Sequence, residues 1–241
     1  MKNNLSDIFN LIKEQFNSPG LSSVLKSIAE SAASEVNPTA GILASGAIGF
    51  LRVFDDYKLN QLVKGLSSGL DQEKKINELY NYVKSSSKRA FLVGNVFRMT
   101  LEAESPKSCV LYGKILSEHI GKNESDFTNE ELIVCNALIN ATDFDLENFV
   151  ILMNQCISQE KDGARRIVFN KKKKDIINME GELNTTCCWC TYNRLFSFNP
   201  LEWGGIEGSD MIIDTDYHVN GAADVLLKWI DEVKQIWEYG N

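Results

Sequence analysis

Residues 187–198 read CCWCTYNRLFSF, which places three of the chain's six cysteines among aromatic side chains. The spacing of Cys187 and Cys190 suits two thiolate ligands of one zinc ion, or a dithiol redox pair. Cysteine and aromatic side chains in such a run are also typical of the buried face of a helix. We therefore predict a helix here, for which Asn184 or Thr185 would be the N-cap.

The rest of the chain offers few partners for a metal or redox site. A structural zinc ion takes four ligands, but there is no second CxxC pair, and the two histidines, His119 and His218, lie far apart in the sequence. A thioredoxin-type site would need a βαβ context, which the sequence lacks. We predict no metal and no cofactor, and we interpret Cys187 and Cys190 as buried thiols, with zinc binding as the alternative.

Composition and charge bound the class of protein. Of 241 residues, 44% are hydrophobic and 24% are charged, as in ordinary globular proteins. A formal net charge of −8 argues against the chain as a whole binding a polyanion. Adjacent cysteines make a poor disulfide framework, and residues 1–16 mix acids with apolar side chains instead of forming a secretory signal. We expect a cytoplasmic location.

Residues 1–126 are predicted to form a bundle of consecutive helices. Apolar side chains recur at three- and four-residue steps, as in residues 59–66. Asp71 can cap a later helix, Ser105-Pro106 marks the start of another with proline at its first position, and Gly121 can stop it. The first part of the chain therefore belongs to a mainly α fold class.

Residues 39–51, TAGILASGAIGFL, carry no charge and are rich in small side chains. Gly41, Ser45 and Gly49 lie four residues apart, so a helix here would offer a smooth face for close packing. The stretch is too short to cross a bilayer, which takes about 20 residues. We predict packing inside the bundle, with an oligomer contact between copies of the chain or a membrane-perturbing element as alternatives.

Residues 127–241 are predicted to form a second domain, with an insertion at about 158–182. Thr128 and Glu131 form a capping-box pattern before one helix, and Thr142 or Asp143 can cap the next. The helix at the CxxC pair follows the insertion. Residues 211–219, MIIDTDYHV, then alternate as a strand does, and a final helix begins directly after them.

This order of elements resembles a winged-helix domain, and phage- or prophage-encoded versions in particular. The matching segments are ELIVCNALINA, DLENFVILMNQC, TCCWCTYNRLFSF and MIIDTDYHVNGAADVLLKWI, read as three helices and then a wing strand with its closing helix. The preceding helices, with their glycine-rich segment, are similar to those of phage-exclusion and abortive-infection proteins. The resemblance implies a helical bundle followed by a winged-helix-like domain with a small β wing.

The third helix of a winged-helix domain commonly enters the DNA major groove. Candidate contacts with a partner or with DNA are Lys171, Lys172, Lys173, Lys174, Thr191, Tyr192, Asn193 and Arg194. Because duplex affinity depends on neutralised phosphates, and acids crowd the wing region, we expect a protein partner. We predict a binding protein in a phage- or defence-related regulatory role. A DNA-binding transcriptional regulator and a membrane-perturbing phage-exclusion effector are the alternatives.

No pattern of residues predicts catalysis. Paired acids such as Asp214 and Asp216 are typical of solvated turns, and no nucleophile is placed near His218. The chain contains neither GxxxxGK[ST] nor GxGxxG, so no phosphate-binding loop is indicated. We predict that the protein is not an enzyme.

Overall fold

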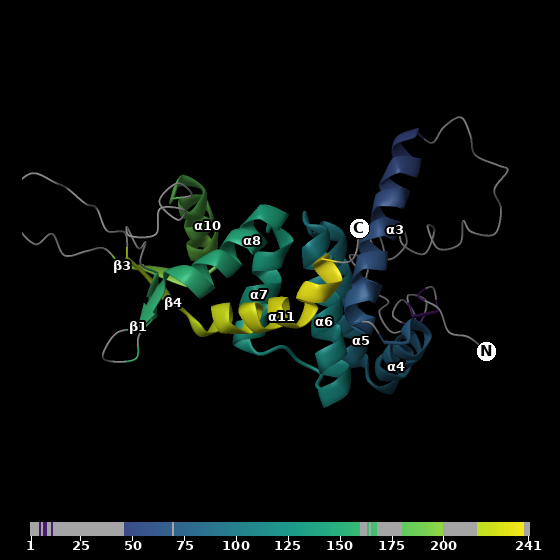
Figure 1. Ribbon diagram of the computed structural model, residues 1–241. Helices are drawn as coiled ribbons and strands as arrows, with labels where there is room; N and C mark the ends of the chain where they lie inside the picture. The colour runs from purple at the N-terminus through teal and green to yellow at the C-terminus, as the bar shows by residue number, and fades with distance from the viewer. Residues whose placement is uncertain are drawn as a thin grey trace, which may run out of the picture. The chain divides into compact units, whose positions relative to one another are not determined.

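The computed structural model is shown in Figure 1. It describes residues 5, 7, 8, 11, 46–68, 70–159, 163, 165–167, 180–199 and 216–238. These residues are mainly helical with a small antiparallel sheet, which confirms the predicted fold class at that level.

The chain divides into two compact units. The first contains residues 1–128 together with 229–241, and the second contains residues 129–228. The predicted domain boundary falls beside this division. The units differ from the predicted domains because residues 229–241 belong with the first unit.

Four consecutive helices make up most of the described part of the first unit. They are α3 (Gly46–Ser67), α4 (Gln72–Ser85), α5 (Ser87–Glu102) and α6 (Pro106–Lys122). The predicted helix starts are confirmed: Asp71 accepts hydrogen bonds from two amides of α4, and Ser105, directly before Pro106, accepts two from α6. Helix α6 ends next to the predicted stop, because Asn123 adopts a left-handed conformation with φ of 61°.

Helices α3 and α6 pack closely side by side (Figure 1). At their crossing a Cβ on Gly65 would lie 1.9 Å from the carbonyl oxygen of Val110, and one on Gly113 would lie 1.9 Å from that of Leu62. Only glycine therefore fits at either position without a shift of backbone. Of the three residues predicted to pack closely, Gly41 and Ser45 lie outside the described residues, and Gly49 lies in the first turn of α3.

The described part of the second unit combines three α-helices with the sheet. Its elements are α7 (Asn129–Ile139), α8 (Asp143–Ile151), a π-helical turn η2 (Leu152–Cys156), β1 (Ile157–Gln159), β2 (Arg165–Ile167), α10 (Glu180–Tyr192), β3 (Phe196–Asn199) and β4 (Asp216–Val219). Thr142 caps α8 in a capping box with Asp145, as the sequence predicts for this helix start. Helix α11 (Gly221–Glu238) begins in this unit and contributes its residues from Trp229 to the first.

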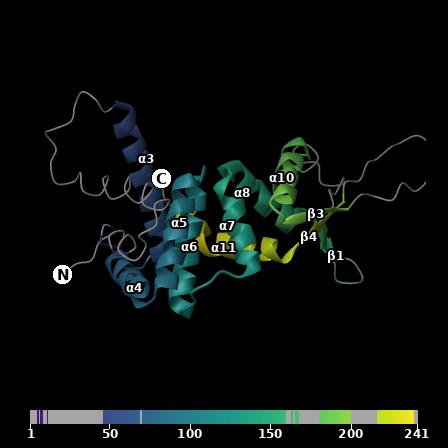
Figure 2. The ribbon, with the colours of Figure 1, turned by 180° about the vertical axis from the view of Figure 1, so that it is seen from behind.

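The sheet has the strand order β1-β2-β4-β3, and all its neighbouring strands are antiparallel. The register pairs Ser197 with His218 and His218 with Arg166, so these three side chains share one face. Phe198, Tyr217 and Ile167 are paired in the same way and share the other face. Figure 2 shows α10 beside this sheet.

Two expectations for the CxxC helix are wrong. Helix α10 begins at Glu180, so Asn184 and Thr185 lie inside the helix and neither is its N-cap. The helix also ends at Tyr192 instead of continuing through Phe198, because Arg194 adopts a left-handed conformation with φ of 61°. The residues that follow, Phe196–Asn199, form strand β3.

Candidate interaction surface

Helix α10 has a buried and an exposed face. Its buried side chains recur at steps of three and four residues and are Leu183, Thr186, Cys187 and Cys190. Its exposed side chains include Glu182, Thr185, Cys188 and Tyr192. The exposed face therefore carries an acid, and the sequence of the helix contains no lysine or arginine.

The two cysteines of the CxxC pair belong to the buried face. Burial raises the pKa of the Cys190 thiol well above its usual value, and the neighbouring Cys187 and Asp145 raise it further. A protonated, enclosed thiol is a poor nucleophile. Among the described residues, no group of three metal-ligating side chains includes either cysteine, and Cys188 points to solvent.

A buried polar network fixes the position of α10 against α8. Thr186 Oγ1 lies 3.5 Å from Asp145 Oδ1 and accepts a hydrogen bond of 3.3 Å from Asn148 Nδ2. Asp145 Oδ2 in turn accepts from the amide and the hydroxyl of Thr142. Because each of these buried groups has a partner, the network locates the helix without leaving an uncompensated polar atom at Asp145.

The end of α10 is a Schellman motif. The amide of Leu195 donates to the carbonyl oxygen of Cys190 at 2.8 Å, and the amide of Arg194 donates to that of Thr191 at 3.1 Å. Arg194 occupies the left-handed position, with φ of 61°, where such motifs usually have glycine. For a residue with a Cβ this conformation costs on the order of 1 kcal/mol.

The predicted contact residues near this end differ in exposure and in hydrogen bonding. Tyr192 is 84% exposed, and Arg194 is exposed, with no hydrogen-bond or ion-pair partner for its guanidinium among the described residues. Thr191 Oγ1 donates to the Cys187 carbonyl at 2.8 Å, and Asn193 Nδ2 donates to the Trp189 carbonyl at 2.9 Å. Those two side chains therefore serve the helix end. We call the exposed pair, Tyr192 and Arg194, the α10 tip.

The remaining predicted contacts, Lys171, Lys172, Lys173 and Lys174, lie outside the described residues. Sequence reasoning missed two further residues at this surface. Phe198 on β3 is 51% exposed, with its ring 5.9 Å from that of Tyr217, and Asn220 bonds to the turn after α10. The alternation in Phe196-Ser197-Phe198 is a strand signal that could have indicated the first of them.

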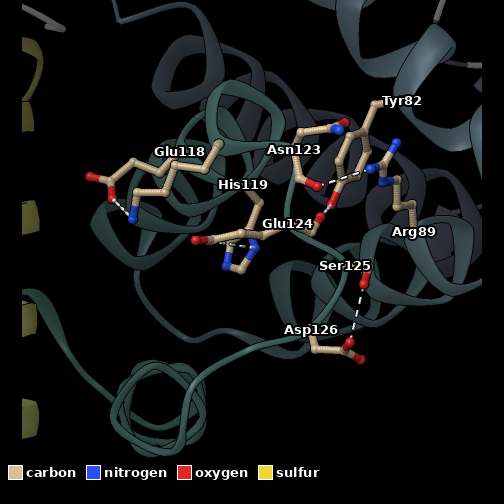
Figure 3. Close-up of polar contacts among 9 residues, drawn as sticks. Tyr82, Arg89, Glu118, His119, Asn123, Glu124, Ser125 and Asp126 are labelled. Carbon is tan, nitrogen blue, oxygen red and sulfur yellow. Dashed lines mark hydrogen bonds and ion pairs between the residues drawn. The ribbon is translucent and has the colours of Figure 1, made fainter.

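A second polar cluster lies in the first unit, at the turn after α6 (Figure 3). The hydroxyl of Tyr82 donates to the carbonyl oxygen of Glu124, and Arg89 Nη2 donates to that of Asn123 at 2.9 Å. The Arg89 guanidinium also lies 5.0 Å from the centroid of the Tyr82 ring. Both side chains bind backbone carbonyls, so this cluster anchors the turn.

A shallow pocket adjoins that turn. It has a volume of about 270 Å³ and is lined by Ser87, Lys88, Phe91, Ser125 and Asp126. Ligand pockets typically hold about 300–1,000 Å³. This pocket is smaller, and its cation and its anion favour no single ligand charge.

Comparisons with protein-family models, with curated proteins and with solved structures find no significant match to the chain. No helix among the described residues combines the length and the apolar character needed to span a membrane.

Proposed function

We propose that the chain is a non-enzymatic binding protein that contacts a partner protein through the α10 tip. The observation that carries this proposal is Arg194 in a left-handed conformation that glycine adopts at less cost. Its guanidinium gains no compensating bond from a described residue. A role for the arginine side chain outside the fold would account for an arginine at such a position.

The chemistry of the tip favours a protein over DNA. Exposed tyrosine and arginine are the residue types that contribute most binding energy at protein interfaces. A helix that reads DNA relies on several cations to neutralise phosphates. Helix α10 has none, and Glu182 on its exposed face would repel the DNA backbone.

The arrangement of the second unit supports a winged-helix-like interpretation. Helices α7, α8 and α10 precede the antiparallel pair β3 and β4, and α11 follows it. In that family the third helix comes directly before the wing, which is the place of α10 here. The strands β1 and β2 between α8 and α10 are an addition to this pattern. The first unit is then the helical bundle, and a phage- or defence-related regulatory role is inferred from the family resemblance alone.

The test uses three variants of the chain as baits, each of which differs from the wild-type chain at one exposed side chain. Tyr192→Ala and Arg194→Ala each remove one half of the tip, and Phe144→Ala removes an aromatic ring that is 43% exposed on α8. Circular dichroism establishes that each variant folds. Nuclease-treated lysate of the native cell is passed over each bait, and captured proteins are quantified by mass spectrometry.

We expect one protein whose captured amount, relative to the wild-type bait, falls at least about tenfold with either tip variant. Phe144→Ala should capture it as the wild type does. If no protein separates the tip variants from Phe144→Ala, the proposal is wrong. Salt-dependent retention of a DNA duplex that is lost in Arg194→Ala and on neutralisation of Lys171–Lys174 would instead support the transcriptional regulator. Binding to liposomes would support the membrane-perturbing alternative.

A further inference from the structure

Asn220, between β4 and α11, makes two hydrogen bonds to the turn after α10 and a third to strand β3. Its amide donates to the carbonyl oxygen of Leu195 at 3.0 Å. Its side-chain Nδ2 donates to the carbonyl oxygen of Arg194 at 3.0 Å, and its Oδ1 accepts from Ser197 Oγ at 3.0 Å. The side chain therefore acts as donor and acceptor at once.

One of these bonds acts on the peptide group that closes α10. The carbonyl of Arg194 and the amide of Leu195 belong to the same planar peptide group. The amide of that group donates to Cys190 at 2.8 Å, and its carbonyl accepts from Asn220 Nδ2 at 3.0 Å. The peptide plane is thus held from both sides, which restrains the backbone of Arg194 in its left-handed conformation, with φ of 61°.

We infer that Asn220 is the positioning residue of the α10 tip. The effect of Asn220 on partner binding rests on the proposed function, whereas its effect on the backbone of Arg194 does not. By holding the peptide group after Arg194, Asn220 sets the direction in which the Arg194 side chain leaves the turn. The same contact stabilises the end of α10 at Tyr192. A partner then meets a tip that is already ordered, which lowers the entropy cost of binding.

An ordinary helix cap does not account for these contacts. The side chain of an N-cap residue accepts hydrogen bonds from the second or third amide of its own helix. Asn220 supplies α11 with its backbone carbonyl, which accepts from Ala223 at 3.0 Å. Among the described residues its side chain bonds only to Arg194 and Ser197, outside α11.

The chemistry of the side chain allows a matched pair of variants. Asn220→Asp keeps the size and the acceptor but replaces the donor with a carboxylate oxygen, which faces the Arg194 carbonyl without a proton. Asn220→Ala removes both functions. Ser197→Ala is the control, because it removes the bond to Oδ1 and leaves the bond to Arg194 in place.

The first measurement needs no partner. NMR of the full chain gives the three-bond amide-to-Hα coupling of Arg194, which reports φ, and the hydrogen-exchange rate of the Leu195 amide. We expect both Asn220 variants to change the coupling and to speed exchange at Leu195 by about tenfold, as loss of one hydrogen bond implies. Ser197→Ala should leave both the coupling of Arg194 and the exchange rate of Leu195 unchanged. The amide of Phe149, which is buried in α8, should exchange at the same rate in all variants. A role confined to capping α11 would instead speed exchange at Ala223.

The second measurement repeats the capture experiment with the Asn220 variants as baits. We expect the protein that depends on Tyr192 to be lost from both. An unchanged coupling and unchanged Leu195 exchange in both variants would overturn the inference, as would full capture despite an altered turn. If the turn changes but no Tyr192-dependent protein exists, the proposed function fails while the positioning of Arg194 by Asn220 is supported.

Discussion

Gly65 of α3 and Gly113 of α6 occupy one helix crossing from opposite sides. A Cβ on Gly65 would meet the backbone of Val110, and a Cβ on Gly113 would meet the carbonyl of Leu62 and, at 2.6 Å, the amide nitrogen of Leu66. Because the obstacles are backbone atoms, no side-chain rotation can relieve the contact. The two helices can approach this closely only while both residues are glycine.

Gly113→Ala is therefore expected to lower the free energy of unfolding by about 1–3 kcal/mol, since the helices must separate to admit the methyl group. Denaturant unfolding of the full chain measures the change. Gly121→Ala is the control on the same helix, because nothing lies within 4 Å of its added Cβ. It should be neutral or stabilising by up to about 1 kcal/mol. Similar effects of the two variants would contradict the close crossing.

Arg194→Gly is expected to stabilise the chain by about 0.5–1 kcal/mol, because it removes the cost of a left-handed residue with a Cβ. Asn123→Gly is the comparison, since Asn123 has the same φ of 61° but asparagine tolerates it better. Its gain should be smaller. Denaturant unfolding distinguishes the two. A loss of stability in Arg194→Gly would show that the arginine side chain supports the fold.

Ser108→Ala should be neutral or stabilising by about 1 kcal/mol. The hydroxyl of Ser108 is fully buried in α6 and has no hydrogen-bond partner in the described structure, so its removal recovers a desolvation penalty. Ser105→Ala, three residues earlier, should cost about 1 kcal/mol because it removes the cap of the same helix. Unfolding curves of the two variants should therefore move in opposite directions. A marked loss in Ser108→Ala would reveal an unrecognised partner.

The environment of the Tyr82 phenol leads us to expect a loss of stability in alkaline solution. Burial raises the pKa of its phenol above 10.0, and the charges of Glu124 and Asp126 raise it further, against the opposing effect of Arg89. The raised pKa means that the folded state holds this proton more tightly than the unfolded state does. Its contribution is complete below pH 10 and is lost as the pH rises from 10 through the folded pKa.

Tyr82→Phe should therefore show a shallower decline of unfolding free energy above pH 10, together with a loss of about 1 kcal/mol at neutral pH from the missing hydrogen bond. Tyr80→Phe, on the same helix, removes a hydroxyl for which the described structure shows no hydrogen bond, and it should retain the steep decline. Identical alkaline slopes in wild type and Tyr82→Phe would contradict the assignment.

Helix starts could be predicted because their signals are local. Asp71, Ser105 and Thr142 each cap a helix with an oxygen that reaches amides only two or three residues away. Such contacts are fixed by residues that are neighbours in the sequence. The exposure of Tyr192 and Arg194 could be anticipated in the same way, from their place at the end of an apolar helical pattern.

Contacts between distant segments could not be predicted. Gly65 and Gly113 stand in ordinary helical patterns, and only the tertiary crossing shows that each one faces a backbone. The end of α10 was missed because its left-handed residue is an arginine, where glycine would have been the usual signal. The sequence indicates a helix start at Asn220. Its bond to Arg194 could not be predicted, because the two residues are neighbours only in space.

The assignment of residues 229–241 to the first unit has a consequence for the order of folding. Within that unit Lys114 of α6 pairs with Glu232, and Lys107 lies 5.3 Å from the centroid of the Trp237 ring. The first unit is thus discontinuous in sequence, and its set of contacts can be complete only after residues 229–241 have been made. The second unit is continuous and needs no residue beyond 228. Because domains generally fold as units, the half of the first unit that is made first has to be joined by residues that are made after the whole second unit.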